Sequence, residues 1–385
     1  MKRYLSLLSA LGLSIILASC GAAATPTKVP ATAVPPTDVP AAATAAPTAA
    51  ATKAAAAGLK IGLVTDVGKL DDRSFNASAW DGAQAGAKAI GGTADYIESS
   101  TPDDYASNIQ QFVDKQYDII ITVGFALGDA TAAAAKKFPK TKFIIVDYAY
   151  DPAIDNVTGL VFEEDKAGFL AGVLAANLSK SGTLAGVYGF QVPAVVKYKE
   201  GFEAGAKYAK PGIKVISTYY PGGIEKAFQD PEWGGTTAGQ SLDQGADFVF
   251  AAAGKTGNGA LTEVAKRTTK DKPLYCIGVD TDQWDSVPEA HTCLITSAEK
   301  LISDGLVDLL KSAGAGTLKG GTVVGKIGIA PFHDFASVVP DALQTQLKQI
   351  NDDLASGKLV IPKPAPATAS AADTSAATMA PTAAQ

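Results

Sequence analysis

The chain has 385 residues, and at about 150 residues per domain this length predicts two or three folded units. Its 33 basic and 39 acidic residues give a formal charge of −6, and 47% of the residues are hydrophobic, which permits a buried core. A nucleic-acid binder would concentrate basic charge on one face, and no basic run in this chain is longer than two residues, as in the pair Lys136 and Lys137. Two histidines and three cysteines are too few for a zinc cluster or a dense disulfide framework. We therefore expect no nucleic-acid partner, no metal and no cofactor.

The first twenty residues have the organisation of an export signal. Residues 1–3 give a short basic start with Lys2 and Arg3, residues 5–17 are mostly apolar, and residues 17–20 are Leu-Ala-Ser-Cys. This pattern predicts a signal peptide over residues 1–19, because the apolar run is short for a permanent membrane span. The last four residues resemble the lipobox of bacterial lipoproteins, which implies cleavage before Cys20 and attachment of a lipid to its thiol. The alternative is an ordinary secretory signal with a chance cysteine.

Two terminal segments have a composition that does not favour folding. Residues 21–57 are almost all Ala, Thr and Pro and include no aromatic side chain, and residues 362–385 have the same composition. Such segments cannot offset their ordering entropy by burial. We predict a disordered tether over residues 20–57, a disordered tail over residues 362–385, and a folded body between them.

Within the folded body, short apolar runs alternate with segments of helical periodicity. Residues 59–66 are an apolar run typical of a strand, and residues 74–90 place Trp80, Ala83 and Ile90 on one helical face. We expect further strands at 94–98, 118–123, 142–147, 157–162, 184–188, 214–220, 247–252, 274–279, 294–296 and 328–330. We expect further helices at 103–115, 128–138, 166–178, 195–209, 236–244, 259–267 and 298–310. This alternation predicts an α/β protein with parallel sheets that are covered by helices on both faces.

The number of strand and helix units indicates two lobes. One doubly wound sheet rarely contains so many units, and about 300 residues is large for a single core. We expect one Rossmann-like lobe from residues 58–162 plus 298–325, and a second from residues 163–297 plus 326–361. The chain would then cross between the lobes in a three-strand hinge.

Hydrogen-bond acceptors and glycine turns follow several of the predicted strands. They are Asp66, Gly124, Asp147, Gly254 and Asp280. Ligands of open parallel sheets bind beyond the carboxyl ends of the strands. We therefore expect these residues to surround a ligand site.

The segment that leads into the helix at residues 74–90 has a distinctive sequence. Residues 68–76 are Gly-Lys-Leu-Asp-Asp-Arg-Ser-Phe-Asn, so Ser74 can cap the helix and the aspartates suit its positive end. Phe75 then lies in the first turn, beside the expected site. From the residue type alone, packing of Phe75 within its own lobe is the more ordinary role.

This segment resembles the signature of the basic membrane protein family of lipoproteins, which includes purine nucleoside receptors of ABC importers. Further segments are similar to the family in the same order, over nearly all of residues 59–335. They are 118–125, 142–147, 161–172, 198–202, 228–231, 245–247, 253–254, 277–280, 296–297 and 300. Each segment is weak evidence by itself, and the ordered set is specific.

The resemblance implies a type I periplasmic-binding-protein fold whose cleft holds a nucleoside. Carried over by motif, the ligand-binding residues are Asp66, Phe75, Asn76, Asp147, Phe228, Gly254, Asp280 and Lys300. In this family the base would stack between Phe75 and Phe228, and the ribose hydroxyls would bind Asp280 and Lys300. Stacking contributes about 1 to 3 kcal/mol per base, and hydrogen bonds to a carboxylate are stronger than neutral ones.

Several assignments stay open at this point. Asp129 could take the place of Asp147, and Gln229 and Trp233 stand where the family has smaller or acidic residues. Without the resemblance, Asp280 could merely cap a turn and Lys300 could lie on a solvated helix face. Cysteines 276 and 293 can form a disulfide in an exported chain, and the sequence does not decide whether they do.

Two features suggest enzymes but lack the required pattern. Gly254-Lys255-Thr256 follows a predicted strand, yet a phosphate-binding loop needs glycine where the chain has Val249. His291 and His333 stand in no recognisable catalytic signature, and we expect both in loops or on the surface. We therefore predict no catalytic residues.

These observations predict a monomeric, lipid-anchored solute-binding protein on the extracytoplasmic face of the cell membrane. It would capture a nucleoside, expected to be a purine nucleoside, by hinge closure and deliver it to the permease of an ABC importer. Two alternatives remain: a ligand-sensing receptor lipoprotein without transport, which would use the same residues, and an exported nucleoside-processing enzyme, which would need a catalytic acid/base or a metal.

Overall fold

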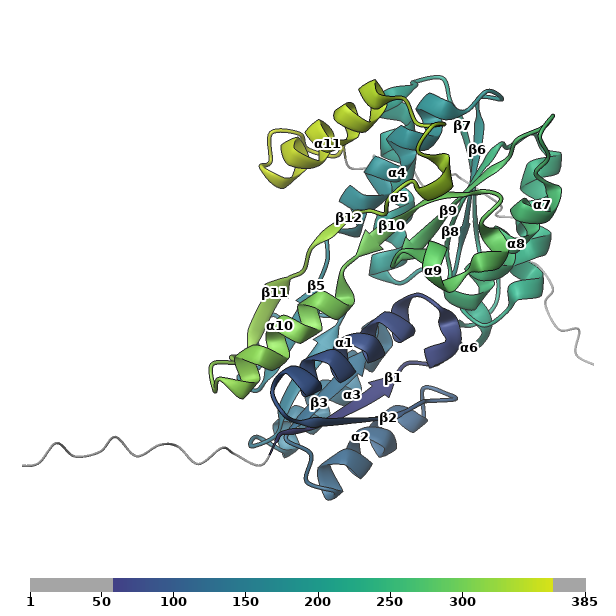
Figure 1. The fold of residues 1–385 in the computed structure, drawn as a ribbon. Helices are drawn as coiled ribbons and strands as arrows, with labels where there is room; N and C mark the ends of the chain where they lie inside the picture. The colour runs from purple at the N-terminus through teal and green to yellow at the C-terminus, as the bar shows by residue number, and fades with distance from the viewer. Residues whose placement is uncertain (1–57, 363–385) are drawn as a thin grey trace, which may run out of the picture. The chain divides into compact units, whose positions relative to one another are not determined.

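The computed structural model describes residues 58–362. The predicted signal peptide, Cys20, the tether and the tail from residue 363 onward lie outside the described residues. Within residues 58–362, no helix is long and apolar enough to cross a membrane. These residues form two lobes, each built on a six-stranded sheet (Figure 1).

The first lobe contains a fully parallel sheet in the order β11-β5-β4-β3-β1-β2. Its strands are β1 (Lys60–Thr65), β2 (Thr93–Ile97), β3 (Ile119–Val123), β4 (Lys142–Val146), β5 (Val157–Val161) and β11 (Gly321–Val324). The central strand β3 is buried along its whole length, because helices cover both faces of the sheet. This explains why its sequence is a continuous apolar run rather than an alternating one.

Helices α1 (Phe75–Ala89) and α10 (Ile302–Gly314) pack on one face of this sheet, and α2 (Asp104–Asp114) and α3 (Gly128–Lys137) pack on the other. Helices α1 and α10 lie side by side in Figure 1. Their close approach depends on glycine, because a Cβ added at Gly82 would lie 2.7 Å from the Cα atom of Ser303. Two segments distant in sequence therefore form one layer.

The second lobe contains a sheet in the order β12-β10-β9-β8-β6-β7, in which only β12 is antiparallel to its neighbour. Its strands are β6 (Thr183–Tyr188), β7 (Lys214–Tyr219), β8 (Phe248–Ala252), β9 (Tyr275–Asp280), β10 (Leu294–Lys300) and β12 (Ile327–Ile329). One face packs against α4 (Glu164–Leu178), α5 (Pro193–Ala209) and α11 (Asp341–Ala355), and the other against α7 (Pro231–Asp243) and α8 (Gly254–Arg267). Apart from the added edge strands β11 and β12, corresponding strands have the same order in both lobes.

The remaining elements are short helices in the loops between the longer helices and strands. They are α6 (Ile224–Ala227), α9 (Gln283–Ser286) and the 3-10 turns η1 (Leu70–Asp72), η2 (Phe125–Leu127), η3 (Pro288–Ala290) and η4 (His333–Phe335). Four of these segments follow strands of parallel sheets on the side where ligands bind: η1, η2, α6 and α9. The loops that carry them therefore supply much of the site described below.

The chain passes between the two sheets after β5, after β10, and between β11 and β12. The expected helix at residues 298–310 is wrong at its start, because β10 continues to Lys300 and α10 begins at Ile302. The expected lobe boundary between residues 297 and 298 falls inside β10, whose last three residues pair with β12. Lys300 therefore ends a strand and does not lie on a solvated helix.

Several other elements differ from the sequence-based expectation. Helix α11 and strand β11 were not predicted, and α8 begins at Gly254 rather than at residue 259. Helix α7 begins at Pro231 rather than at residue 236, because Asp230 caps it by accepting a hydrogen bond from the backbone N–H of Trp233 at 2.9 Å. An Asp-Pro start of this kind is a recognised helix signal, so the sequence does contain a signal for the earlier start.

The structure also answers the open question about the cysteines. Cys276 in β9 and Cys293 just before β10 form a disulfide, with 5.3 Å between their Cα atoms. The bond joins two neighbouring strands of the second sheet. It therefore holds together the starts of two strands whose other ends are Asp280 and Lys300.

Candidate ligand-binding site

All eight residues predicted from the sequence line one cavity between the two lobes. The cavity contains about 660 Å³ of empty space, part of it open to solvent. Asp147 lines it, whereas the alternative Asp129 is exposed on α3 and does not. The two residues that depart from the family pattern, Gln229 and Trp233, do not line the cavity either.

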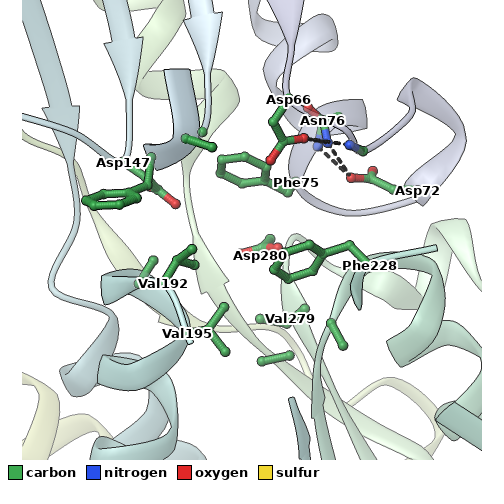
Figure 2. Close-up of a pocket in the computed structure, with 18 of the residues that line it drawn as sticks. Asp66, Asp72, Phe75, Asn76, Asp147, Val192, Val195, Phe228, Val279 and Asp280 are labelled. Atoms are coloured by element: carbon green, nitrogen blue, oxygen red, sulfur yellow. Dashed lines mark hydrogen bonds between the residues drawn. The ribbon is translucent and has the colours of Figure 1, made fainter. Parts of the chain in front are cut away.

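Two phenylalanines contribute to the cavity from different lobes. Phe75 stands in the first turn of α1, and Phe228 follows α6. Figure 2 shows both rings beside the same open space. Phe75 and Phe228 therefore line the same cavity. A flat molecule between them would contact an aromatic ring from each lobe.

The position of Phe228 depends on two glycines. A Cβ added at Gly189, just after β6, would lie 2.1 Å from a ring carbon of Phe228, so a larger residue there would displace the ring. Gly254 adopts a left-handed φ of 56° at the start of α8, a conformation that glycine adopts without steric cost. The next residue, Lys255, donates its backbone N–H to the carbonyl of Phe228 at 3.0 Å. This bond attaches the Phe228 turn to α8.

Asp66, Asp72 and Asn76 form a hydrogen-bonded group at the start of α1 (Figure 2). Asp66 follows β1 and accepts hydrogen bonds from the backbone of Gly68 at 2.8 Å and the amide of Asn76 at 3.3 Å. Asp72 accepts from the backbone N–H groups of Ser74, Asn76 and Ala77 at 2.8 to 3.1 Å. The expected cap from the Ser74 side chain is wrong, because Ser74 makes no side-chain cap bond. The aspartate two residues earlier caps the helix instead.

The carboxyl groups of Asp66 and Asp72 have raised pKa values. Burial raises the pKa of Asp66 to about 6, although its hydrogen bonds from Gly68 and Asn76 lower it. Burial likewise raises the pKa of Asp72 to about 6, against the opposite effect of the backbone N–H groups. Both groups therefore change charge in a pH range close to neutrality.

Lys300 lies among three carboxylates. Its ammonium nitrogen is 2.5 Å from Asp147 Oδ2, 3.6 Å from Asp280 Oδ1 and 3.8 Å from Glu164 Oε1. The nitrogen also lies 4.5 Å from the centre of the Phe75 ring, within the range of a cation–π contact. The side chain is only 3% exposed, so the lysine is committed to this cluster.

The pKa values in this cluster follow from burial and charge together. Burial lowers the pKa of Lys300, but the nearby carboxylates of Asp147, Asp280 and Glu164 raise it by more. The pKa of Lys300 is therefore well above its ordinary value. Burial raises the pKa of Asp280 to about 6, and the Lys300 ammonium opposes that rise. Lys300 therefore remains charged, and the carboxylates around it compete for one cation.

Asp147 and Asp280 occupy equivalent places in the two sheets. Asp147 follows β4 and Asp280 ends β9, and each strand is third from the same edge of its sheet. Both have left-handed backbones, with φ values of 64° and 68°. Aspartate is one of the few residues other than glycine that adopts this conformation readily. This backbone conformation costs of order 1 kcal/mol at each residue, and both residues line the cavity.

Some acceptor atoms at the cavity have no partner within residues 58–362. Asp147 Oδ1 and Asn76 Oδ1 are buried and make no hydrogen bond there. Buried polar atoms are nearly always paired in proteins. Both atoms belong to cavity-lining residues, so the site presents unused acceptors to a molecule that carries hydrogen-bond donors.

The balance of charge limits the kind of ligand that fits. Four carboxylates, those of Asp66, Asp72, Asp147 and Asp280, line the cavity together with the single ammonium of Lys300. A phosphate group would meet a net negative field in a poorly hydrated place, which is unfavourable. The arrangement suits an uncharged flat ring with several hydroxyl or amino donors.

Sequence reasoning missed three contributors to this site. The local sequence indicates only helix-start charge for Asp72 and for Glu164, yet Glu164 is 1% exposed. Tyr198 donates its hydroxyl to the carbonyl of Ala298 at 3.2 Å and lies 3.5 Å from Asp280 Oδ1. All three residues stand in segments that resemble the family, which was the available signal. Nothing in the local sequence indicates that Glu164 is buried.

The histidines lie away from the cavity. The rings of His291 and His333 stack on either side of Trp284, at 3.9 and 4.7 Å between ring centres. His333 also lies 2.7 Å from Asp282 Oδ2. Neither histidine lines the cavity, so this stack belongs to the packing of the second lobe.

Comparisons with known proteins show which family the chain is similar to. Residues 60–354 match the model of the Bmp family, described as ABC transporter substrate-binding protein PnrA-like. The chain is 31% identical over 322 residues to a CD4+ T-cell-stimulating antigen of Listeria monocytogenes, covering 79% of this chain and 88% of that protein. It is 31% identical over 324 residues to the ABC transporter nucleoside-binding protein BmpA of Lactococcus lactis, covering 79% of this chain and 89% of that protein.

A solved structure supports the fold independently. The structure is similar to an ABC transporter solute-binding protein from Aeropyrum pernix, with a TM-score of 0.71 and 22% identity over 80% of this chain and 94% of that one. The predicted fold, a type I periplasmic-binding-protein fold, is thereby confirmed. By fold, by ordered motifs and by identity to relatives, the chain belongs to the Bmp family of ABC transporter substrate-binding proteins.

Proposed function

We propose that this protein captures a purine nucleoside between its two lobes. The observation that carries the proposal is that Phe75 and Phe228, from different lobes, line one cavity together with Asp147, Asp280 and Lys300. Aromatic stacking tolerates different bases, whereas polar contacts choose among them. The Lactococcus relative described as a nucleoside-binding protein supports the same ligand class.

The sugar would account for the acidic half of the cavity. Asp280 Oδ1 and the unpartnered Asp147 Oδ1 are acceptors that suit vicinal ribose hydroxyls. A carboxylate that accepts from a hydroxyl makes a charge-assisted hydrogen bond. A ligand without those hydroxyls would leave the acceptors unpaired in a closed site. A binding site rejects a ligand that lacks such a hydrogen-bonding group more strongly than a ligand that differs only by a methylene group.

We further propose that the protein is anchored by lipid at Cys20 and passes its ligand to an ABC permease. The Leu-Ala-Ser-Cys sequence at residues 17–20 supports the anchor, and membership of a substrate-binding family supports the partner. Because the cavity is formed by both lobes, a bound ligand would stabilise the closed arrangement of the lobes. A permease could then distinguish loaded from empty protein.

Calorimetry with the full chain tests the ligand class. The panel contains adenosine, inosine, guanosine, cytidine, free adenine, ribose and adenosine monophosphate. We expect purine nucleosides to bind most tightly, free adenine and ribose weakly, and the monophosphate weakly because of the carboxylates. Tight binding of the monophosphate, or no binding of any nucleoside, would refute the proposal. Release of free base or another product during the titration would favour the enzyme alternative.

A further inference from the structure

A second set of contacts joins the lobes beside the cavity. It centres on residues 71–73 of the first lobe, between β1 and α1, which we call the 71–73 segment. Asn258 donates its side-chain amide to the carbonyl of Asp72 at 2.9 Å. The carbonyl of Arg73 accepts from Gln283 Nε2 at 3.3 Å and from Ser286 Oγ at 2.9 Å. All the donors belong to the second lobe.

Two ion pairs surround these hydrogen bonds. Arg73 Nη1 lies 3.0 and 3.1 Å from the two carboxylate oxygens of Glu289. Lys255 Nζ lies 2.5 Å from Asp71 Oδ1. This pair uses the lysine of the Gly254-Lys255-Thr256 sequence, which therefore serves contact between the lobes rather than phosphate binding. The 71–73 segment thus meets α8, α9 and η3 of the second lobe.

The second-lobe side of this contact is already ordered by bonds within its own lobe. Gln283 is 1% exposed, and its Oε1 atom accepts from the backbone N–H of Val279 at 3.0 Å. Its amide also donates to Asn258 Oδ1 at 2.9 Å. A preorganised donor set loses little entropy when it meets its acceptor. Gln283 and Asn258 are therefore held in position to receive the 71–73 segment.

The contact is linked to the cavity through Asp72. Its side chain caps α1, which carries Phe75, while its backbone carbonyl bonds Asn258. Arg73, Asn258, Gln283, Ser286 and Glu289 do not line the cavity. They therefore have no contact through which to recognise a ligand directly, yet they fix the start of α1 against the second lobe.

We propose that the 71–73 segment and its second-lobe partners form a latch that stabilises the closed arrangement through residues that, apart from Asp72, do not line the cavity. Arg73, Asn258, Gln283, Ser286 and Glu289 are positioning residues of this latch. The identity of the ligand rests on the proposed function, whereas the closure itself does not. The apparent affinity of a binding protein scales with the fraction of molecules in the binding-competent state. Loosening the latch therefore weakens every ligand by the same factor.

Single-molecule fluorescence energy transfer on the full chain measures the latch without a ligand. Dyes are attached through non-natural amino acids at the exposed positions Lys136 on α3 and Lys266 on α8, so the cysteines are untouched. We expect a measurable closed population in the ligand-free protein. Arg73→Glu should reduce it, because it replaces the attraction to Glu289 with repulsion, and Asn258→Ala should reduce it without a charge change.

Calorimetry of the same variants gives the second readout. We expect Asn258→Ala to weaken adenosine and inosine alike, by about tenfold, because it removes the bond to Asp72 that joins the lobes and the bond that helps hold Gln283 in position. Adding Glu289→Arg to Arg73→Glu should restore both the closed population and the affinity. Such rescue distinguishes a contact between the lobes from local damage to either one.

The matched control is Glu263→Gln. It breaks an ion pair of the same type, Arg267 to Glu263 at 2.6 Å, which lies within α8 and does not cross between the lobes. We expect no change in either readout.

The proposal is wrong if the ligand-free wild type has no closed population, or if Arg73→Glu and Asn258→Ala leave that population unchanged. If no nucleoside binds, the proposed function fails, and the ligand-free measurements still decide the latch.

Discussion

At the scale of single residues, the site is defined by a few side chains with strict positions. One lysine is shared by three carboxylates, and the two phenylalanines come from different lobes. Asp147 and Asp280 reach the cavity because they end equivalent strands with a left-handed backbone. We expect each side chain to have its own role in binding, and single substitutions test these roles one at a time.

Phe228→Ala should weaken all purine nucleosides to a similar extent. Stacking contributes about 1 to 3 kcal/mol per base, so calorimetry should show a loss of about five- to 150-fold. The control is Tyr208→Ala, which removes an aromatic ring that is 52% exposed and lies outside the cavity. A loss confined to one base would show that Phe228 selects the base rather than stacking on it.

Asp280→Asn should mainly affect ligands with ribose hydroxyls. The amide keeps the size of the side chain but removes the charge that strengthens its hydrogen bonds, which are worth about 1.5 to 3 kcal/mol each. Dissociation constants of adenosine, 2′,3′-dideoxyadenosine and adenine would be compared, with Asp129→Asn as an exposed control. Equal losses for ribosides and the free base would contradict the assignment of Asp280 to the sugar.

At the scale of secondary-structure elements, the second sheet is cross-linked at the start of two strands whose opposite ends reach the site. The disulfide between Cys276 and Cys293 closes a 17-residue separation between β9 and β10. Asp280 and Lys300 stand at the ends of those two strands. The cross-link therefore stabilises the framework that positions both residues.

Replacing both cysteines, Cys276→Ala with Cys293→Ala, should lower the free energy of unfolding by about 2 to 4 kcal/mol. Denaturant titration of the wild type and the double variant measures the difference. Reducing agent should destabilise the wild type to the same extent and leave the variant unchanged. A wild type insensitive to reductant would show that the two thiols are not bonded in solution.

At the scale of the whole molecule, the buried carboxylates couple folding and binding to pH in opposite directions. Burial raises the pKa values of Asp66, Asp72 and Asp280 to about 6. Between their unfolded pKa values near 4 and about pH 6, the folded protein holds more protons than the unfolded chain. These groups therefore contribute less stability as the pH rises through that window.

The ligand-free protein should thus gain stability from these groups as the pH falls from 7 to 5. The affinity for the ligand should fall over the same pH change, because a carboxylate accepts hydrogen bonds from hydroxyls best when it is ionised. We expect affinity to fall by about tenfold per pH unit below pH 6 for one required carboxylate. Denaturation and calorimetry at both pH values test this. Asp280→Asn should reduce the pH dependence of binding, and an unchanged dependence would exclude Asp280 as its source.

Local sequence patterns predict much of this architecture. Apolar runs such as residues 118–123 and 142–147 indicate buried parallel strands, because only a sheet covered on both faces can be apolar along its length. Since parallel strands end at one edge of a sheet, the sequence by itself predicts that Asp66, Asp147 and Asp280 border a ligand site. The ordered motifs that resemble the family then identify the two phenylalanines.

Tertiary contacts decided what local patterns could not. Residues 298–300 have the composition of a helix start, yet they pair with β9 and β12 as a strand, and this pairing buries Lys300 among the carboxylates. The latch likewise joins Asp72 and Arg73 to partners 186 and 213 positions later in the chain. Helical periodicity and capping depend on neighbours a few residues away, and a local pattern can therefore be read from the sequence. Strand pairing at the hinge, burial of a charge and contact between lobes depend on residues brought together only by the folded chain, so they were settled by the tertiary structure.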